Sequence, residues 1–169
     1  MEFTVNTKLD LSGLDKIKEA CKALSKTVEV GILNNPKEAA IGTIQHFGGF
    51  GLTWNGPYKG EIGYFYYGPF KGEPALIPPR PFIAAPVEHF GGEILTMSAK
   101  EYFDFTPKGA AKTLMVAGDT MVKDIQYWMD NSMVYGYPNG WRTILTKGFN
   151  HPLIDKGTLR SSIEYEVTK

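Results

Sequence analysis

The stretch from Pro107 to Met133, PKGAAKTLMVAGDTMVKDIQYWMDNSM, gives the strongest fold signal in the chain. Its apolar and small residues recur every three or four positions, which is the period of one face of an α-helix. The sequence therefore predicts a long helix that begins after Pro107 and continues to about Met133. The residues expected on its buried face are Ala111, Leu114, Met115, Gly118, Met121, Val122, Ile125, Trp128, Met129 and Ser132.

A second helix is predicted just before this one, from about Ala84 to Tyr102. Gly91 and Gly92 weaken its middle, because each glycine costs about 1 kcal/mol relative to alanine inside a helix. The expected apolar face of this helix consists of Val87, Phe90, Ile94 and Leu95.

Two shorter helices and a strand are predicted in the first third of the chain. Residues 11–24 show helical spacing, and Cys21 is interpreted as a small buried hydrophobe on that face. Alternating valine and isoleucine side chains predict a strand over residues 28–32. Residues 37–47 fit a helix that Gly48 ends. The apolar face of the first helix comprises Leu11, Leu14, Ile17, Cys21 and Leu24.

Residues 48–72 differ in composition from the rest, with eight glycines and eight aromatic residues. Within them, residues 61–67 are suited to a strand, because aromatic side chains favour a half-buried pleated surface. We interpret residues 48–76 as an extended hairpin or loop inserted into a single domain that spans residues 1–169. It either folds over its own core or contacts another chain, and we favour the second, because exposed aromatic surface commonly marks an interface. The candidate interface residues in this segment are Phe50, Trp54, Tyr58, Tyr64, Tyr66 and Phe70.

A proline-rich stretch, Ile77-Pro78-Pro79-Arg80-Pro81-Phe82, follows the insertion, and we call it the proline strap (residues 77–82). Proline fixes its own φ and pushes the preceding residue to extended geometry, so the strap is expected to be stiff and extended. Arg80 either pairs with a carboxylate of a neighbouring copy, which makes it a candidate interface residue, or anchors the strap within its own chain.

Near the end of the sequence lies HPLIDKGTLRSSI, which we call the PLIDKG segment (residues 151–163). Asp155 is expected to accept backbone hydrogen bonds in a turn, with Gly157 at positive φ. Ile163, Tyr165 and Val167 then alternate with polar residues, which predicts a final strand over residues 163–168.

Composition bounds the function. The chain has 18 basic and 18 acidic residues and no net charge, which argues against a dedicated nucleic-acid binder and permits self-association. One cysteine excludes an internal disulfide framework and a cysteine-rich zinc site. No apolar run approaches the roughly 18 residues of a membrane span, and residues 1–10 lack the apolar core of a signal peptide. The expected compartment is the cytoplasm of the cell that makes the protein.

Arrangements that carry catalysis are not evident. The chain has neither a Gly-x-Ser-x-Gly elbow nor a phosphate-binding Gly-Lys-Ser/Thr loop. Its histidines, His46, His89 and His151, are far apart in sequence, and Pro152 disfavours a helix that would bring His151 and Asp155 together on one face. We therefore predict no enzyme activity, no catalytic residue, no metal site and no cofactor. A small hydrolase or nuclease that uses Asp155 with a histidine is a less favoured alternative.

The order of these segments resembles the tail-completion, or virion-morphogenesis, proteins of tailed bacteriophages, which join head and tail in the neck. The resemblance rests on the strand over residues 28–32, the Gln45-His46-Phe47-Gly48 helix end, the proline strap and the PLIDKG segment, and it covers nearly the whole chain. The chain departs from the family pattern in two ways. The insertion over residues 48–72 is long, and Lys156 stands at a position where a threonine is common. The motif residues are Pro78, Pro79, Pro81, Phe82, Asp155, Gly157, Leu159 and Arg160.

The resemblance implies a non-enzymatic virion protein with an α+β fold, in which helices pack on one face of a small, mostly antiparallel sheet. It also implies a ring, usually a hexamer, that contacts the head-connector or adaptor ring and the tail-tube or tail-terminator proteins. DNA would only pass through such a ring, because a chain of balanced charge neutralises few phosphates. Location in the virion, after assembly in the host cytoplasm, follows from the same resemblance.

Three alternatives to a neck ring remain open from the sequence. The chain could be a tail-tube terminator or a minor capsid-associated protein, which the same motifs barely exclude. It could also be a peptide-binding module that uses the aromatic segment.

Overall fold

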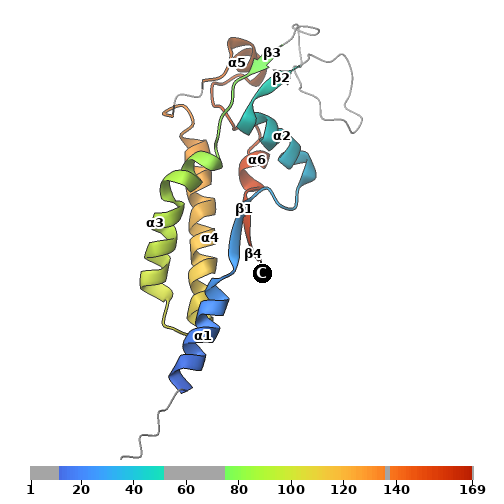
Figure 1. Cartoon of the computed structure of the whole chain (residues 1–169). Helices are drawn as coiled ribbons and strands as arrows, with labels where there is room; N and C mark the ends of the chain where they lie inside the picture. Colours follow the sequence, from blue (N-terminus) through green and yellow to red (C-terminus); the bar gives the residue numbers. More distant parts are fainter. Residues whose placement is uncertain (1–11, 52–74, 136–137, 169) are drawn as a thin grey trace, which may run out of the picture.

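The computed structural model describes residues 12–51, 75–135 and 138–168. Two long helices lie side by side along an elongated body, and a two-stranded ribbon runs next to them (Figure 1). The fold is α+β, as predicted, and the strand pairs of the described residues are antiparallel. In chain order the elements are α1 (Ser12–Leu24), β1 (Thr27–Gly31), α2 (Pro36–Phe47), β2 (Gly49–Gly51), β3 (Ala75–Ile77), α3 (Ala84–Tyr102), α4 (Pro107–Asp130), α5 (Trp141–Lys147), α6 (Thr158–Ser161) and β4 (Glu164–Thr168).

A tight turn joins α3 to α4. Asp104 accepts hydrogen bonds from the hydroxyl of Thr106 at 2.6 Å and from its backbone N–H at 3.1 Å, and the hydroxyl bond above all lowers the pKa of the Asp104 carboxyl. The Thr106 oxygen accepts from the N–H of Gly109 at 3.0 Å and so caps the first turn of α4. Pro107 follows the cap, at a position where a missing N–H costs nothing. The predicted start of the long helix is therefore confirmed.

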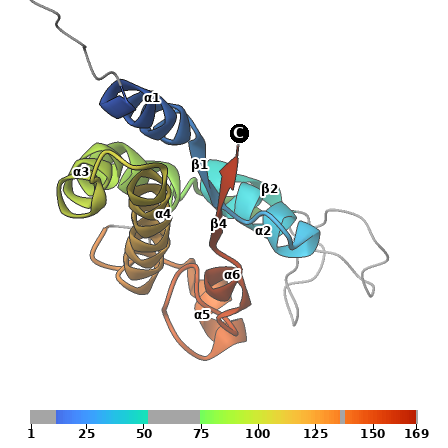
Figure 2. The same ribbon diagram turned by 90° about the horizontal axis from the view of Figure 1, so that it is seen from below.

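The ribbon joins strands from distant parts of the sequence. Val28 pairs with Val167 and Val30 pairs with Tyr165, so both predicted strands are confirmed. The ribbon packs on α4, with α3 on the far side of that helix (Figures 1 and 2). A β-carbon on Gly118 of α4 would lie 2.3 Å from the Tyr165 ring, so glycine is what lets helix and strand approach each other here.

The core is built around α4. Ile125 and Met129 are fully buried, and Trp128 stacks on Tyr135 with ring centroids 3.8 Å apart. The long helix is therefore buried largely along the predicted stripe, but it ends at Asp130 and is followed by turns. The core cluster comprises Phe82, Ile94, Ala117, Met121, Ile125, Trp128, Met129, Leu153, Leu159 and Ile163.

Two residues expected on the buried face of α4 are exposed instead. Met115 is 55% exposed, and Ala111 is exposed as well. Both lie in the first turns of α4, on a side that no described element covers. At this end Ala110 and Thr113 are buried instead, so the periodicity identifies the stripe but places its start about one position too late.

The bounds of α1 are as predicted, but its expected apolar face is not buried. Leu14 and Ile17 are 52% and 42% exposed, and Cys21 is exposed too, so the interpretation of Cys21 as a buried hydrophobe was wrong. Ala20 is the residue that α1 buries fully. The first half of α1 projects beyond the ends of α3 and α4, which leaves its apolar stripe without a described partner (Figure 1).

The bounds of α3 are also as predicted, while most of its expected face is open. Ile94 is buried, but Val87, Phe90 and Leu95 are 40%, 40% and 43% exposed. The helix α4 covers one narrow side of α3, and no other described element lies over the rest.

Helix α2 agrees with the prediction at both ends. The Asn35 side chain accepts a hydrogen bond from the N–H of Glu38 at 3.2 Å, and Gly48 ends the helix with a φ of 75°. The residues just before the PLIDKG segment form α5, which ends at Gly148 with a φ of 80°.

The strands β2 and β3 close the base of the insertion. Gly49 pairs with Ile77 and Gly51 with Ala75, so the chain leaves the body and returns to it on neighbouring antiparallel strands. This is the arrangement expected at the base of a hairpin-like insertion. The strand predicted over residues 61–67 lies outside the described residues.

Candidate functional site

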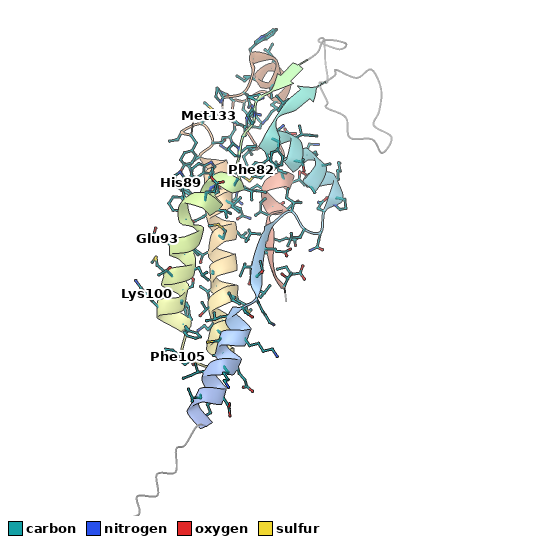
Figure 3. The ribbon with its side chains drawn as sticks, in the orientation of Figure 1. Phe82, His89, Glu93, Lys100, Phe105 and Met133 are labelled. Atoms are coloured by element: carbon teal, nitrogen blue, oxygen red, sulfur yellow. The ribbon has the colours of Figure 1, made fainter. Side chains whose placement is uncertain are left out.

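The two segments that carry the resemblance meet in one core. Phe82, which ends the proline strap, is fully buried, and Leu159 of the PLIDKG segment belongs to the same cluster (Figure 3). Gly42 of α2 lies beside both, because a β-carbon there would be in ordinary van der Waals contact with Leu159 at 3.4 Å and with Phe82 at 3.6 Å. The same atom would come within 2.6 Å of Ile32. The motif residues Phe82 and Leu159 therefore hold α2, the strap and the PLIDKG segment together.

Arg80 anchors the strap within its own chain. Its backbone N–H donates to the carbonyl oxygens of Gln45 and His46 at 2.8 and 3.2 Å. Its guanidinium donates to Oε1 of Gln45 at 2.8 Å and to the carbonyl oxygen of Pro138 at 3.2 Å. The residue is 5% exposed. The structure therefore shows the intrachain role of Arg80, and the burial of the residue leaves little of it for the contact with a neighbouring copy that the sequence also allowed.

The strap also packs against the end of α2. A β-carbon on Gly48 would lie 2.7 Å from the carbonyl oxygen of Ile77 and 2.8 Å from the nitrogen of Pro79. Pro78 and Pro79 are exposed, whereas Pro81 is half-buried beside the core. The Phe-Gly helix end and the prolines, which are 30 residues apart in sequence, thus form one structural unit.

The PLIDKG segment is fixed by a lysine from α5. The ammonium of Lys147 donates to the carbonyl oxygens of His151, at 2.8 Å, and of Ile154. Burial lowers the pKa of Lys147, while the charge of Asp155 opposes that shift. Gly157 has the predicted positive φ, 79°. Asp155 is exposed, and among the described residues its carboxylate accepts no backbone hydrogen bond, so the predicted turn hydrogen bond is not found.

Arg160 ties the same segment to the end of α4. Its Nε and Nη2 donate to the two carboxylate oxygens of Asp130 at 2.7 and 2.8 Å, which raises the pKa of Arg160. Its carbonyl oxygen accepts from the Gln126 amide at 3.3 Å. Nearby, the buried hydroxyl of Ser132 donates to the carbonyl oxygen of Pro152 at 2.8 Å. The PLIDKG segment is therefore held to the end of α4 by side-chain hydrogen bonds, just before the chain enters β4.

An open apolar groove lies on the other side of the body. Its volume is about 820 Å³, and it runs over the surface of α4 between α3 on one side and β1 and α2 on the other. Small residues line much of it, including Gly42, Gly91 and Ala117. The larger lining residues Val87 and Leu95 belong to the exposed stripe of α3. No prediction from the sequence named this groove, although the apolar spacing of α3 was its signal.

Further apolar side chains are exposed at both ends of the molecule. Leu14 and Ile17 are exposed on the projecting half of α1, and Phe47, which also lines the groove, is 74% exposed. Trp141 and Leu145 of α5 are 59% and 65% exposed. A chain with balanced charge that presents this much apolar surface is suited to association.

Most residues predicted to form a subunit interface cannot be compared with the structure. Trp54, Tyr58, Tyr64, Tyr66 and Phe70 lie outside the described residues. The backbone of Phe50 belongs to β2. That position places the start of the insertion at the same end of the molecule as α5 (Figure 1).

Within residues 12–51, 75–135 and 138–168, no three His, Cys, Asp or Glu side chains form a group that could hold a metal ion. Of the helices in these ranges, none is both long and apolar enough to cross a bilayer. His151, the histidine closest in sequence to Asp155, has Nε2 2.8 Å from the carbonyl oxygen of Asp130.

Comparison with known proteins gives no relative: no family model, no curated protein and no solved structure matches this chain.

Proposed function

We propose that this chain is a structural protein of a tailed-bacteriophage neck, where copies of it form a ring that joins the head connector to the tail. The observation that carries the proposal is the distribution of burial along the motifs. Phe82, Leu159 and Arg160 have structural roles inside the chain, while apolar residues outside the motifs lie exposed on α1, α3 and α5. Such a chain has a rigid body and large surfaces left for partners.

Charge supports the self-association part of the proposal. With 18 basic and 18 acidic residues, copies of the chain do not repel one another through net charge. The exposed apolar residues are spread over separate faces, which suits a head-to-tail contact rather than a two-fold one. Repetition of a head-to-tail contact closes a ring when its rotation permits. Through such a ring DNA would pass with few phosphate contacts.

Inactivation of the gene in its parent phage tests the proposed place in the virion. Loss of a neck protein should leave DNA-filled heads and finished tails that do not join, as seen by electron microscopy of the lysate. Tails of uncontrolled length would instead indicate a tail-tube terminator. Defective heads would indicate a minor capsid-associated protein. Normal infectious particles would overturn the proposal.

Native mass spectrometry of the purified chain tests the ring. A discrete closed oligomer, expected to be a hexamer, supports the proposal, and a monomer at high concentration both alone and with purified tails contradicts it.

The D155N protein tests whether the chain is a structural protein or an enzyme that uses Asp155. Because Asp155 is exposed and faces the charge of Lys147, D155N should keep its fold and complement the inactivated gene.

A further inference from the structure

The helix layer of this molecule is wider than the sheet that covers it. Neighbouring helices lie about 8–10 Å apart and neighbouring strands about 4.8 Å apart, so two strands cover roughly one helix. The β1–β4 ribbon packs on α4 and leaves α3 uncovered (Figure 2). The groove of about 820 Å³ is this uncovered space, and one further strand would fit over its apolar floor.

Among the residues that the structure describes, no strand lies beside the edge of β1 that borders the groove. In the described residues β1 pairs with β4 alone. Val28, Val30 and Ile32 line the groove, and no residue of β4 does, so the unpaired edge of β1 faces α3. An unpaired edge beside an apolar surface binds an extended segment by strand addition, in which main-chain hydrogen bonds give affinity and alternate side chains fill the surface.

The chain contains a segment of suitable pattern just before α1. Residues 2–8 have the sequence EFTVNTK, in which Phe3 and Val5 alternate with Glu2, Thr4 and Asn6. This alternation is typical of a strand with one apolar face. Residues 2–8 lie outside the described part of the chain.

Geometry favours the groove of another copy for this segment. The groove reaches Leu24, the last residue of α1, and the 13-residue helix carries Ser12 about 20 Å away from that point. A return along α1 would use about six extended residues, roughly residues 6–11, and so would take up part of the 2–8 segment before it reached β1. The first half of α1 also projects outward with Leu14 and Ile17 exposed, as a helix does that continues onto a neighbour (Figure 1).

We propose that the groove between α3 and β1 binds residues 2–8 of a second copy of this chain as an added strand on the free edge of β1. Phe3 and Val5 would then face Leu95 and the floor formed by α4. The inference rests on the self-association in the proposed function and specifies its contact. Each copy gives one segment and receives another, which is a head-to-tail interface.

Cross-linking between two differently sized copies tests the contact. Both carry C21S, since the native thiol is exposed and would react. One copy carries V5C and the other L95C, and they are mixed and mildly oxidised. A disulfide requires Cα atoms within about 7 Å, so a heterodimer on a non-reducing gel reports the docked strand. We expect this heterodimer to be the main cross-linked product.

Two matched controls fix the orientation of the segment. T4C lies on the opposite face of the same segment, and its heterodimer with L95C should be lost. E93C lies on the side of α3 that faces away from the ribbon, so its heterodimer with V5C should be lost as well (Figure 3). Equal yields for V5C and T4C would overturn the inference. So would a V5C/L95C double variant that forms only an internal disulfide, because its own segment would then occupy the groove.

The mass of the oligomer, measured for the C21S protein and for a variant that lacks residues 1–10, distinguishes the proposed ring from the proposed groove contact. An oligomer that persists without residues 1–10, or that gives no V5C–L95C heterodimer, overturns the groove assignment and leaves the ring standing. A C21S protein that stays monomeric both alone and with purified tails overturns both. Loss of the oligomer on deletion, with the circular dichroism spectrum retained, supports both.

Discussion

The two helices of the central hairpin, α3 and α4, have similar apolar spacing but differ in how much of each helix is buried. Both α3 and α4 show apolar residues at helical spacing, yet ten of the 24 residues of α4 are buried and only three of the 19 residues of α3. On α4, the ribbon, α1 and α3 cover the stripe. On α3, Val87 and Leu95 face the open groove.

This difference shows that an apolar stripe predicts contact with a partner surface, but not whether that surface belongs to the same chain or to another. The partners of α4 are anchored in its own chain by the motif contacts of Phe82 and Arg160. The stripe of α3 has no such partner in the described residues. Substitutions on the enclosed side should therefore cost folding stability, and matched substitutions on the open side should cost little or none.

Phe82→Ala should have the largest effect. Phe82 is fully buried beside Gly42, and its ring centroid lies 5.5 Å from that of His46 in an edge-on arrangement. Truncation therefore leaves a cavity where the proline strap and the PLIDKG segment meet. We expect a loss of about 3–5 kcal/mol in the free energy of unfolding, measured by urea denaturation. Phe90→Ala on α3 is the control. It should cost far less, because Phe90 is 40% exposed, and equal losses would refute the contrast.

A glycine on each helix gives the next comparison. Gly118→Ala on α4 would place a β-carbon 2.3 Å from the Tyr165 ring, and overpacking of this kind costs about 1–3 kcal/mol. Gly92→Ala on α3 meets nothing within 4 Å and should stabilise the helix by up to about 1 kcal/mol. Thermal unfolding should thus shift in opposite directions. Addition of Tyr165→Leu should recover part of the loss in the α4 variant only.

Arg160→Ala should have an intermediate effect. Its two hydrogen bonds to Asp130 join the PLIDKG segment to α4, but both side chains are more than a third exposed, and exposed ion pairs contribute only about 1 kcal/mol or less. Arg160→Lys keeps the charge but loses the bidentate geometry, so it should fall between Ala and the native protein. A double-mutant cycle with Asp130→Ala measures the pair. A coupling energy near zero would show that contacts other than this ion pair hold the PLIDKG segment to α4.

The local elements could be predicted from the sequence because short-range physics determines them. Pro107 and the Thr106 cap set the start of α4, Gly48 sets the end of α2, and alternation sets β1 and β4. The positive φ of Gly157 follows from the same reasoning.

The partners of these elements could not be predicted in the same way. Cys21 and Leu95 have the spacing of core residues, and they are exposed because no element in the described part of the chain covers them. The buried role of Arg80 depends on Gln45 and Pro138, which lie 35 and 58 residues away. The groove is likewise the product of a helix layer and a ribbon of unequal width, which periodicity does not measure.

His46 gives the smallest test, because it lies where the enclosed and the open regions meet. Its ring contacts buried Phe82 and exposed Phe47, and it also lines the groove. Burial lowers the pKa of His46 below 6.5. Between its two pKa values the unfolded chain binds more protons than the folded one, so stability falls as the pH falls through 6.5 and levels off below the folded pKa. His46→Gln should show a smaller fall in melting temperature between pH 7.5 and 5.5 than the native chain. If a second copy covers the groove, burial of His46 increases and the native fall should steepen at concentrations where the oligomer forms. A fall that does not change with concentration would mean that this part of the groove stays open in the assembly.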